Sequence, residues 1–385
     1  MHVAAENFEA DYDAFEFTDA VNSQVYNQVR FGLTPSFRYN KGELQGRFFY
    51  NKNEREFKSD FPSLYEGRNL QTEIVHRHHF SNTVQTLAGL NYQRMAYGQE
   101  NANTIDTTSI YTFDPYASLL IDLPVGLTVH AGVRLNTHSE YGGKVVYNVN
   151  PSYLINRDGD WRVKLGASVS TSYITPSLYQ LYSFYGNSAL VPEEATNYEA
   201  GVTLYGSDAF TFSATWFLRD ESQPIDFVSL FDDGGNYIGG QYRNLTAERE
   251  VKGIELLATA KVGKLASISA NYTHLDTDKP ESFYRIPTDK YGVSVNLRPV
   301  KSGSVSLRFT HTGDRTIFDF NSFSEITLRH YDLVDLSASY GFLQSRLTVY
   351  GSVNNMLDEH FVAVFGYTTR GRNYNAGVRY AFGKS

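Results

Sequence analysis

The chain has 385 residues, among them 29 tyrosines and 26 phenylalanines, and it carries a net charge of -8 and no cysteine. Without cysteine, disulfides, thiolate metal sites and cysteine nucleophiles are excluded, and the negative charge argues against a partner that is a nucleic acid. A hydrophobic content of 41% with so many aromatic residues favours a sheet that has one apolar face and one wet face.

Several segments alternate between apolar and polar residues with a period of two, as half-buried strands do. In chain order, the clearest are 253–262, 303–310, 331–342, 345–354 and 374–382. In the second of these, Val305, Leu307 and Phe309 alternate with serine, arginine and threonine. The polar face keeps charged side chains at strand centres, where the core of a soluble sandwich would need apolar ones. The apolar face is therefore predicted to be the outside, in contact with lipid.

The connections between these strands are predicted to alternate in length. Short ones lie at 40–42, 123–126, 156–160, 205–209, 263–264, 298–303 and 341–345. Long polar ones are expected at 55–67, 98–107, 137–144, 174–195, 220–236, 275–288, 313–329 and 355–371. Outer-membrane barrels have short turns on the periplasmic side and long loops on the extracellular side. At roughly ten residues per membrane crossing, the chain gives about seventeen strands, starting near Tyr26.

The predicted fold is therefore all-β: a transmembrane antiparallel β-barrel with short periplasmic turns and long extracellular loops. No apolar run reaches the roughly 18 residues that a membrane-spanning helix would need. Residues 1–25 are expected to form an extracellular-type acidic loop, and residues 26–385 a single barrel domain. Aromatic residues near the strand ends are expected to form belts at the two membrane interfaces.

Three stretches carry more than periodicity: TSYITPSLYQLYSFYGNSALVPEEATNYEAGV (171–202), VKGIELLATA (251–260) and VNNMLDEHFVAVFGYTTRGRNYNAGVRYAF (353–382). They resemble the barrel of TonB-dependent outer-membrane receptors, in particular the cobalamin-transporter branch. The resemblance implies a barrel of 22 strands, of which this chain would supply about seventeen. It also implies a plug domain and a short energy-coupling segment, the TonB box, which are absent here. Another part of the receptor or another chain would supply them.

The resemblance implies active transport of cobalamin or a related corrinoid across the outer membrane of a Gram-negative bacterium. The TonB–ExbB–ExbD complex would supply the energy through the missing N-terminal part. A siderophore (iron chelate) receptor is one alternative, because the two branches share strand motifs and differ in their loops. A passive porin-like or structural barrel is another. The expected partners also include the lipid bilayer, lipopolysaccharide, and a surface lipoprotein or other chain.

Enzyme activity is not expected, because the sequence has no nucleophile elbow, phosphate-binding loop or zinc-protease motif. The candidate site is instead a loop rich in aromatic residues. We expect Tyr182, Phe184, Tyr185 and Asn187 to bind the ligand, because aromatic rings and an amide suit a large, partly planar molecule. The alternative is that these aromatic residues belong to the outer membrane-interface belt.

A calcium site is implied by the same resemblance, in DYDAFEFTD (11–19). Members of the cobalamin branch bind calcium between aspartates of two neighbouring loops, and Asp11, Asp13 and Asp19 would supply one loop's share. Calcium favours six to eight oxygen ligands, so these residues need further ligands from a second loop. The alternative is a solvated acidic loop.

Three other groups are expected to have structural roles rather than to bind a ligand or a metal. They are the histidines His76, His78 and His79, the strand-end residues Glu193, Glu194 and Arg372, and the loop tip Asp232 and Asp233.

Overall fold

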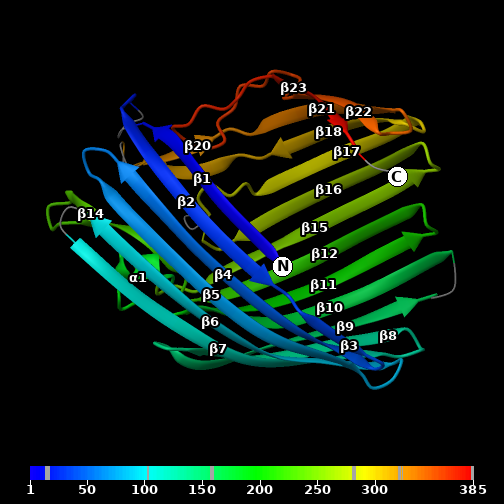
Figure 1. The fold of residues 1–385 in the computed structure, drawn as a ribbon, viewed down its shortest axis with the longest axis horizontal. Coiled ribbons are helices and arrows are strands. Elements are labelled where there is room, and N and C mark those ends of the chain that lie inside the picture. Colours follow the sequence, from blue (N-terminus) through cyan, green and yellow to red (C-terminus); the bar gives the residue numbers. More distant parts are fainter. Residues whose placement is uncertain are drawn as a thin grey trace. The chain divides into compact units, whose positions relative to one another are not determined.

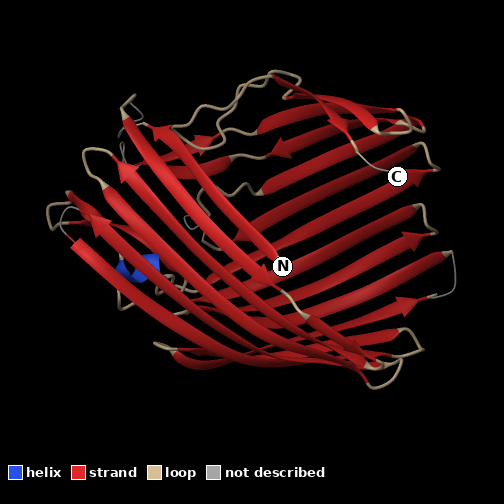
Figure 2. Cartoon of the chain, viewed as in Figure 1, coloured by secondary structure: helices blue, strands red, loops and turns tan. Residues whose placement is uncertain are grey.

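The computed structural model describes residues 1–13, 18–101, 104–156, 160–279, 283–319, 322 and 324–382. Strands dominate these residues, and the described helix is one short segment, α1 (Leu178–Tyr182) (Figure 2). Nineteen strands belong to one sheet, and β13–β14 and β19–β20 form separate hairpins. The all-β prediction is confirmed, with more strands than the expected seventeen. In the part of the chain that the structure describes, no helix is long and apolar enough to span a membrane.

The chain divides into two compact units. The first comprises residues 1–152, 168–198 and 219–249, and the second comprises 153–167, 199–218 and 250–385. Each is described separately below.

In the first unit, seven antiparallel strands pair in the order β1, β2, β4, β5, β6, β7, β8. The strands up to β10 are β1 (His2–Tyr12), β2 (Asn22–Leu33), β3 (Ser36–Tyr39), β4 (Gly42–Lys58), β5 (Ser63–His79), β6 (Val84–Asn101), β7 (Thr104–Asp122), β8 (Leu127–His138), β9 (Gly142–Ile155) and β10 (Trp161–Ile174). The hairpin of β13 (Ile225–Phe231) and β14 (Tyr237–Asn244) also lies in this unit.

Strands β4 to β7 have one apolar face and one polar face. On the apolar face, Phe48, Tyr92 and Phe113 lie in a single row across the sheet, with Thr72 between the first two, and all three rings are exposed. On the polar face, neighbouring strands are joined by hydrogen bonds between amide side chains, such as that from Gln71 Nε2 to Asn91 Oδ1 at 3.1 Å. This is the alternation expected of a sheet that meets lipid on one side and water on the other.

Two predictions about the N-terminal third are wrong. In place of an acidic loop over residues 1–25, β1 pairs with β2 along its whole length, from His2 opposite Gly32 to Tyr12 opposite Asn22. In place of long loops at 55–67 and 137–144, only short connections join β4 to β5 and β8 to β9, and in the segment 98–107 β6 continues to Asn101 and β7 begins at Thr104. Strands β4 to β7 are therefore 17 to 19 residues long and appear as the long blue to cyan arrows of Figure 1. A membrane crossing needs about 9–11 residues, so these strands extend well beyond one.

In the second unit, seven antiparallel strands pair in the order β15, β16, β17, β18, β21, β22, β23. The remaining strands of the chain are β11 (Glu193–Gly206), β12 (Phe210–Ser222), β15 (Arg249–Val262), β16 (Ala266–Thr277), β17 (Asp289–Val300), β18 (Gly303–Thr312), β19 (Arg315–Asp319), β20 (Ser324–Leu328), β21 (Tyr331–Phe342), β22 (Leu347–Asn354) and β23 (Asn373–Tyr380). The short turns predicted between these strands are present. The long connections predicted at 220–236 and 313–329 contain the hairpin strands β13 and β19–β20.

Aromatic rings cover glycines on neighbouring strands at several places. A Cβ atom added to Gly377 would lie 2.4 Å from the Tyr350 ring, and one added to Gly89 would lie 2.4 Å from the Tyr116 ring. In both pairs the two residues are direct cross-strand partners. The missing side chain leaves room for the ring to lie flat over the neighbouring strand, which fixes the strand register.

Candidate ligand-binding site

The predicted loop folds around helix α1, which begins with a capping box. Ser177 Oγ accepts a hydrogen bond from the Gln180 backbone N–H at 3.2 Å, and Gln180 Oε1 accepts one from the Ser177 N–H at 2.8 Å. Leu178 and Leu181 are buried, so the helix is anchored by one apolar side. A five-residue helix has little intrinsic stability, so these contacts determine its position.

The β13–β14 hairpin lies directly against this loop. Asn187 Nδ2 donates a hydrogen bond to the Tyr242 carbonyl at 3.1 Å, and the Tyr242 N–H donates one to the Tyr185 carbonyl at 3.1 Å. Further along, the Asn244 amide both donates to and accepts from the backbone of Val191, each at 2.9 Å. The two segments therefore form a single ordered platform rather than two independent loops.

The loop is also held by Tyr141, which lies in the connection between β8 and β9. The Tyr141 hydroxyl donates a hydrogen bond to the carbonyl of Leu190, whose side chain is only 2% exposed. Burial raises the pKa of Tyr141 to about 12, and the nearby Tyr182 and Tyr173 act in the same direction. Tyr141 therefore stays protonated, and keeps its donor, across the physiological pH range.

Tyr179, on helix α1, is the centre of a cluster of aromatic side chains. Its ring centroid lies 6.2–6.4 Å from those of Tyr65, Tyr97 and Tyr242, which come from β5, β6 and β14. Burial, and then the neighbouring Tyr65 and Tyr242, raise the pKa of Tyr179, so its hydroxyl is a donor at neutral pH. Edge contacts continue from this centre in both directions, through Tyr12 and Phe57 on one side and Phe227, Tyr185 and Phe184 on the other.

A cavity of about 540 Å³ opens beside Tyr179, on the polar face of the extended part of β4 to β6. Arg55 lies in its wall, with its guanidinium carbon 5.4 Å above the centre of the Tyr26 ring. Within the described ranges, Arg55 forms no ion pair with a carboxylate. The cavity therefore offers aromatic faces, the Arg55 guanidinium, and the carboxylate of Glu66, which is itself paired with Lys52 and Arg68. Its lining residues are Tyr26, Asn53, Arg55, Phe57, Tyr65, Glu66, Gly67, Tyr97 and Tyr179.

The four predicted ligand residues lie close to this cavity without lining it. Tyr185 contacts Phe227 in the aromatic cluster, and Phe184 is 84% exposed at the edge of the cluster. Tyr182 is partly buried near Tyr141. Asn187 uses its amide to hold the loop, donating to Tyr242 and accepting from the Ala189 N–H at 3.0 Å. Ligand contact by these four residues stays a prediction.

The residues that line the cavity were missed by the sequence reasoning. Tyr65, Tyr97 and Arg55 are far from α1 in sequence, and they meet it only because β4 to β6 extend beyond the expected strand ends. Tyr179 lies in the predicted loop, but the sequence pattern does not show which of the two rings, that of Tyr179 or that of Tyr182, lines the cavity. The one local signal is the capping pair Ser177 and Gln180, which fixes the side of α1 that carries Tyr179.

The proposed calcium ligands are exposed. Asp11 lies at the end of β1, opposite Ser23, and Asp13 and Asp19 lie outside the strands. Among the residues for which placement is described, no group of three histidine, cysteine or acidic residues is arranged to hold a metal ion. These aspartates do not form a calcium site by themselves, so their role stays a prediction that depends on further ligands.

The remaining singled-out residues make structural contacts. Glu194 pairs with Lys144 at 2.6 Å, and a carboxylate oxygen of Glu193 accepts the Ile225 N–H. His76 and His78 both bond the Tyr39 hydroxyl, at 2.7 and 2.8 Å.

Two acidic residues also have local backbone roles. Asp232 accepts the N–H groups of Gly234 and Asn236, which closes a turn at the loop tip. Asp358 accepts the N–H of Arg372 at 2.7 Å, and the Arg372 guanidinium donates to the Met356 carbonyl at 2.9 Å. These bonds between Asp358, Arg372 and Met356 hold the connection between β22 and β23.

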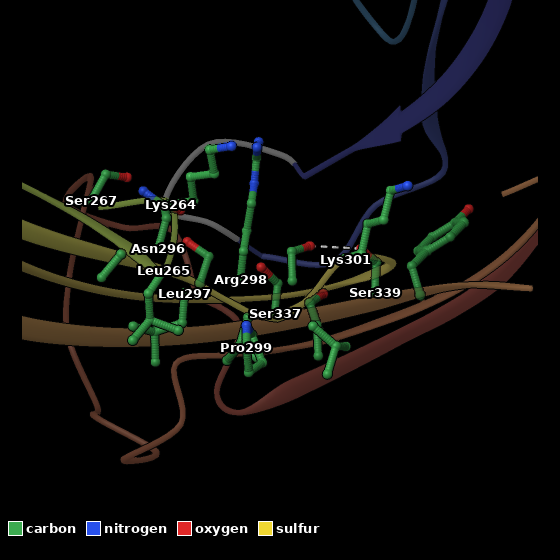
Figure 3. Close-up of a pocket in the computed structure, with 18 of the residues that line it drawn as sticks. Lys264, Leu265, Ser267, Asn296, Leu297, Arg298, Pro299, Lys301, Ser337 and Ser339 are labelled. Carbon is green, nitrogen blue, oxygen red and sulfur yellow. Dashed lines mark hydrogen bonds between the residues drawn. The ribbon is translucent and has the colours of Figure 1, made fainter. Parts of the chain in front are cut away.

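The second unit contains a separate polar recess of about 1250 Å³. Its floor is a row of residues that lie directly opposite one another on seven strands: Lys261, Ser267, Asn296, Ser306, Ser337, Ser352 and Asn375. Lys264 and Lys301, in short turns, and Arg298, near the end of β17, extend to one side of the sheet (Figure 3). None of these three forms an ion pair within the described residues. The recess therefore has a wall of mostly small, polar side chains and a rim of basic ones.

Comparison with known proteins places these features in context. Residues 4–356 match a family model described as TonB dependent receptor-like, beta-barrel. The chain is 27% identical over 335 residues to the vitamin B12 transporter BtuB of Vibrio cholerae serotype O1, covering 84% of this chain and 50% of BtuB. It therefore spans about half the length of the curated relatives that it matches.

Solved structures share the fold. The siderophore receptor PirA from Acinetobacter baumannii superposes with a TM-score of 0.78 at 16% identity, covering 96% of this chain and 64% of PirA. A mutant of the ferric enterobactin receptor PfeA from Pseudomonas aeruginosa gives 0.76 at 16% identity, covering 94% of this chain and 62% of PfeA. At these identities the likeness concerns the fold alone.

Proposed function

Because the chain belongs to the TonB-dependent receptor-like β-barrel family, we propose that it forms the barrel wall of an outer-membrane transporter for cobalamin or a related corrinoid. The observation that carries the proposal is the aromatic cavity around Tyr179, together with the similarity to a vitamin B12 transporter. The cavity lies on the polar face of strands that extend beyond the length of a membrane crossing. A ligand arriving from outside would reach it before entering the barrel.

The chemistry of the cavity suits a corrinoid. Such a ligand combines a wide, nearly flat ring with peripheral amides and a phosphodiester. The edges and faces of Tyr65, Tyr97 and Tyr179 would pack against the flat ring, and the Asn53 amide would bond a peripheral amide. Arg55 would face the phosphodiester, because a guanidinium matches phosphate oxygens with two parallel hydrogen bonds. A volume of about 540 Å³ holds one side of such a ligand rather than the whole of it.

Energy coupling and the plug belong to the same proposal. The polar recess of the second unit has small side chains that allow close approach of another polypeptide. Its uncompensated Lys264, Arg298 and Lys301 would attract acidic or polar groups on that polypeptide. We place a plug domain of the family type against this recess, with the TonB–ExbB–ExbD complex acting on the plug. A passive pore would leave the recess open to water.

An iron chelate is the second candidate ligand. Arg55 has no carboxylate partner within the described residues, and an unpaired cation beside tyrosines also suits an anionic catecholate or hydroxamate complex. The structures of PirA and PfeA, both siderophore receptors, share the fold. The two ligand classes differ in charge, so a direct competition separates them.

The deciding experiment is equilibrium binding to the detergent-solubilised full-length receptor. We expect cyanocobalamin to bind at micromolar concentration or below, and Arg55→Gln to weaken its binding about tenfold through loss of the phosphate contact. Arg55→Lys, which keeps the charge but not the planar fork, should lie between the two. Absence of cyanocobalamin binding alongside intact binding of a ferric siderophore would overturn the corrinoid assignment and support the second candidate.

A further inference from the structure

Tyr39, His76 and His78 form a cluster on the apolar face of the first unit, next to the turns that join β3 to β4 and β5 to β6. His76 and His78 are two residues apart on β5, so their side chains project from the same face of the sheet. His76 pairs with Leu44, which lies on the same side of β4 as the exposed ring of Phe48. The two imidazoles therefore lie side by side at one end of the apolar face.

Gly42 allows the Tyr39 ring to reach these histidines. Tyr39 is the cross-strand partner of Gly42, and Gly42 is the partner of His78, so the three residues lie in one row across β3, β4 and β5. A Cβ atom added to Gly42 would lie 2.6 Å from the Tyr39 hydroxyl oxygen. Because glycine has no such atom, the ring lies across β4 and brings its hydroxyl to His76 and His78 on the next strand.

Three donor atoms meet at this hydroxyl. The Tyr39 oxygen lies 2.7 Å from His76 Nε2 and 2.8 Å from His78 Nδ1, and the two imidazole planes are tilted by only 14° and 25° from the phenol plane. Each of these nitrogens presents either its lone pair or its proton to the oxygen. The third donor is a phenol, so the cluster is distinct from groups of three histidine, cysteine or acidic residues, of which the described part of the chain has none.

We propose that Tyr39, His76 and His78 bind a late first-row divalent metal ion, Cu²⁺ more tightly than Zn²⁺. Imidazole nitrogens suit both ions, a phenolate oxygen adds a negative charge, and the affinity of a given site is higher for Cu²⁺ than for Zn²⁺. Metal–ligand bonds of about 2.0–2.1 Å place neighbouring ligand atoms roughly 3 Å apart. The Tyr39 oxygen already lies 2.7–2.8 Å from each nitrogen, so a metal ion can enter with small movements of the side chains.

Binding exchanges one proton for the metal ion. The phenol O–H ionises and its proton goes to water, while the imidazole that donates to the oxygen moves its proton to its other ring nitrogen. Both imidazoles then remain neutral and bind through the nitrogens that face Tyr39. Water completes the coordination, because the cluster lies at the surface: the Tyr39 side is 38% exposed, and His76 is exposed as well.

The metal ion would join β3 to β5 across the strand between them. Strand β3 is four residues long, from Ser36 to Tyr39, and it pairs with β4 over those four residues alone. A bond from its last residue to two histidines of β5 holds this short strand to the rest of the sheet. Because the three donors come together only in the folded chain, the metal should stabilise the folded state.

The test is titration of the full-length receptor, purified in detergent without a histidine tag, with copper(II) sulfate. We expect Cu²⁺ binding to give a phenolate-to-copper charge-transfer band in the visible spectrum and nitrogen hyperfine splitting in the electron paramagnetic resonance spectrum. Tyr39→Phe should lose the band and keep the nitrogen splitting. His76→Gln with His78→Gln should weaken binding at least about a hundredfold, because even the loss of an outer partner of a metal site costs about 10–100-fold. Zinc chloride should displace Cu²⁺ only at a higher concentration.

The matched control is His79→Gln, which removes an imidazole from the same strand but from the opposite face. It should bind Cu²⁺ and show the band as the wild type does. A band that is lost in this control, or that is unchanged in Tyr39→Phe, would overturn the assignment of the phenolate. Equal Cu²⁺ affinity in the wild type and in the double histidine variant would overturn the site.

The outcome does not depend on the proposed function, because the titration contains no corrinoid and no siderophore. A receptor that binds Cu²⁺ as described but fails to bind cyanocobalamin would overturn the proposed ligand and keep this site. If the double histidine variant does not fold, Tyr39→Phe alone decides, because it keeps the ring over Gly42 and removes only the hydroxyl. Its loss of the charge-transfer band would support the site, and an unchanged band would count against it.

Discussion

At the scale of single residues, Tyr179 is the side chain through which the loop and the sheet meet. Its ring contacts Tyr65 and Tyr97 on the strands and Tyr242 on the hairpin, and it lines the cavity. We expect Tyr179→Ala to weaken ligand binding by the full-length receptor about tenfold, because it removes a ring face and several edge contacts together. Isothermal titration with cyanocobalamin, the proposed ligand, measures the change.

Phe184→Ala provides the comparison, because Phe184 lies in the same loop but is 84% exposed. If the cavity is the binding site, this change should alter affinity less than about twofold. The opposite ranking, with Phe184 more important than Tyr179, would favour the tip of the loop over the cavity as the ligand contact. Tyr179→Phe separates the ring from the hydroxyl, which stays protonated at neutral pH.

A residue of the site could be predicted from the sequence only where the signal for its role lies in the residues next to it. The stretch from 171 to 202 was recognisable by its residues, but its position beside the cavity is known only from the structure. The choice of Asn187 as a ligand residue rested on its amide, but the amide holds the backbone at Tyr242 and Ala189. Arg55 carried no signal, because its role depends on Tyr26 and on a strand that continues where a loop was expected.

At the scale of strands, the pair of Tyr350 and Gly377 gives a direct test of register. A methyl group at position 377 would lie 2.4 Å from the Tyr350 ring, so the ring must move. We expect Gly377→Ala to destabilise the refolded barrel by about 1–3 kcal/mol in urea titrations, as overpacking does. Adding Tyr350→Ala should cancel part of that loss in a double-mutant cycle.

Gly166→Ala is the matched control, because a Cβ added at Gly166 has no neighbour within 4 Å. Gly166 also lies within a strand, β10, so the substitution changes the backbone entropy in the same sense. Equal effects at the two positions would remove the argument from ring packing.

The connection between β22 and β23 should respond to pH through Asp358. The backbone N–H of Arg372, and after it the Arg372 charge, hold the pKa of this carboxyl below its usual range. A lowered pKa in the folded state means that the contact stabilises the loop above the carboxyl's ordinary pKa of about 4 and is lost as pH falls below it. We expect the hydrogen-exchange protection factor of the Arg372 amide to fall between about pH 4 and pH 2.

Asp358→Asn provides the reference for this pH effect. Its protection factor should be lower than that of the wild type at neutral pH and should not change over the same acidic range. A wild-type protein whose protection is constant from neutral to acidic pH would contradict the role given to the carboxylate.

The expected strands and the observed strands differ where the environment changes. Alternation identifies a strand only where one face meets an apolar medium. Beyond Tyr50, the outer positions of β4 are Lys52 and Glu54, and the inner ones are Asn53 and Arg55, so both faces are polar and the pattern disappears. The ladder nevertheless continues through Phe57 opposite Ser63, because cross-strand backbone hydrogen bonds do not depend on apolar side chains. This is why the sequence suggested loops there.

At the scale of the whole molecule, the predicted calcium site needs more oxygen ligands than the three aspartates supply. Asp11, Asp13 and Asp19 provide carboxylates, while calcium takes six to eight oxygen ligands. In the full-length receptor we expect calcium to release or absorb heat on titration, and Asp13→Asn with Asp19→Asn to weaken that binding at least about tenfold. A full-length receptor that gives no heat with calcium would end the prediction.

Under the proposed function, the extended sheet of β4 to β6 has a further consequence for how a scarce nutrient would be captured. Flexible loops must give up conformational freedom when they close on a ligand, and that loss reduces affinity. Here most of the cavity wall is made of paired strands, in which β5 pairs with β4 from Ser63 to His78 and with β6 from Ser63 to His79. Little of the protein therefore has to become ordered when the ligand binds. Because that cost in conformational entropy is small, almost all of the free energy of the ligand contacts contributes to the affinity. A receptor built in this way is ready to bind before its ligand arrives, which suits a nutrient present at very low concentration.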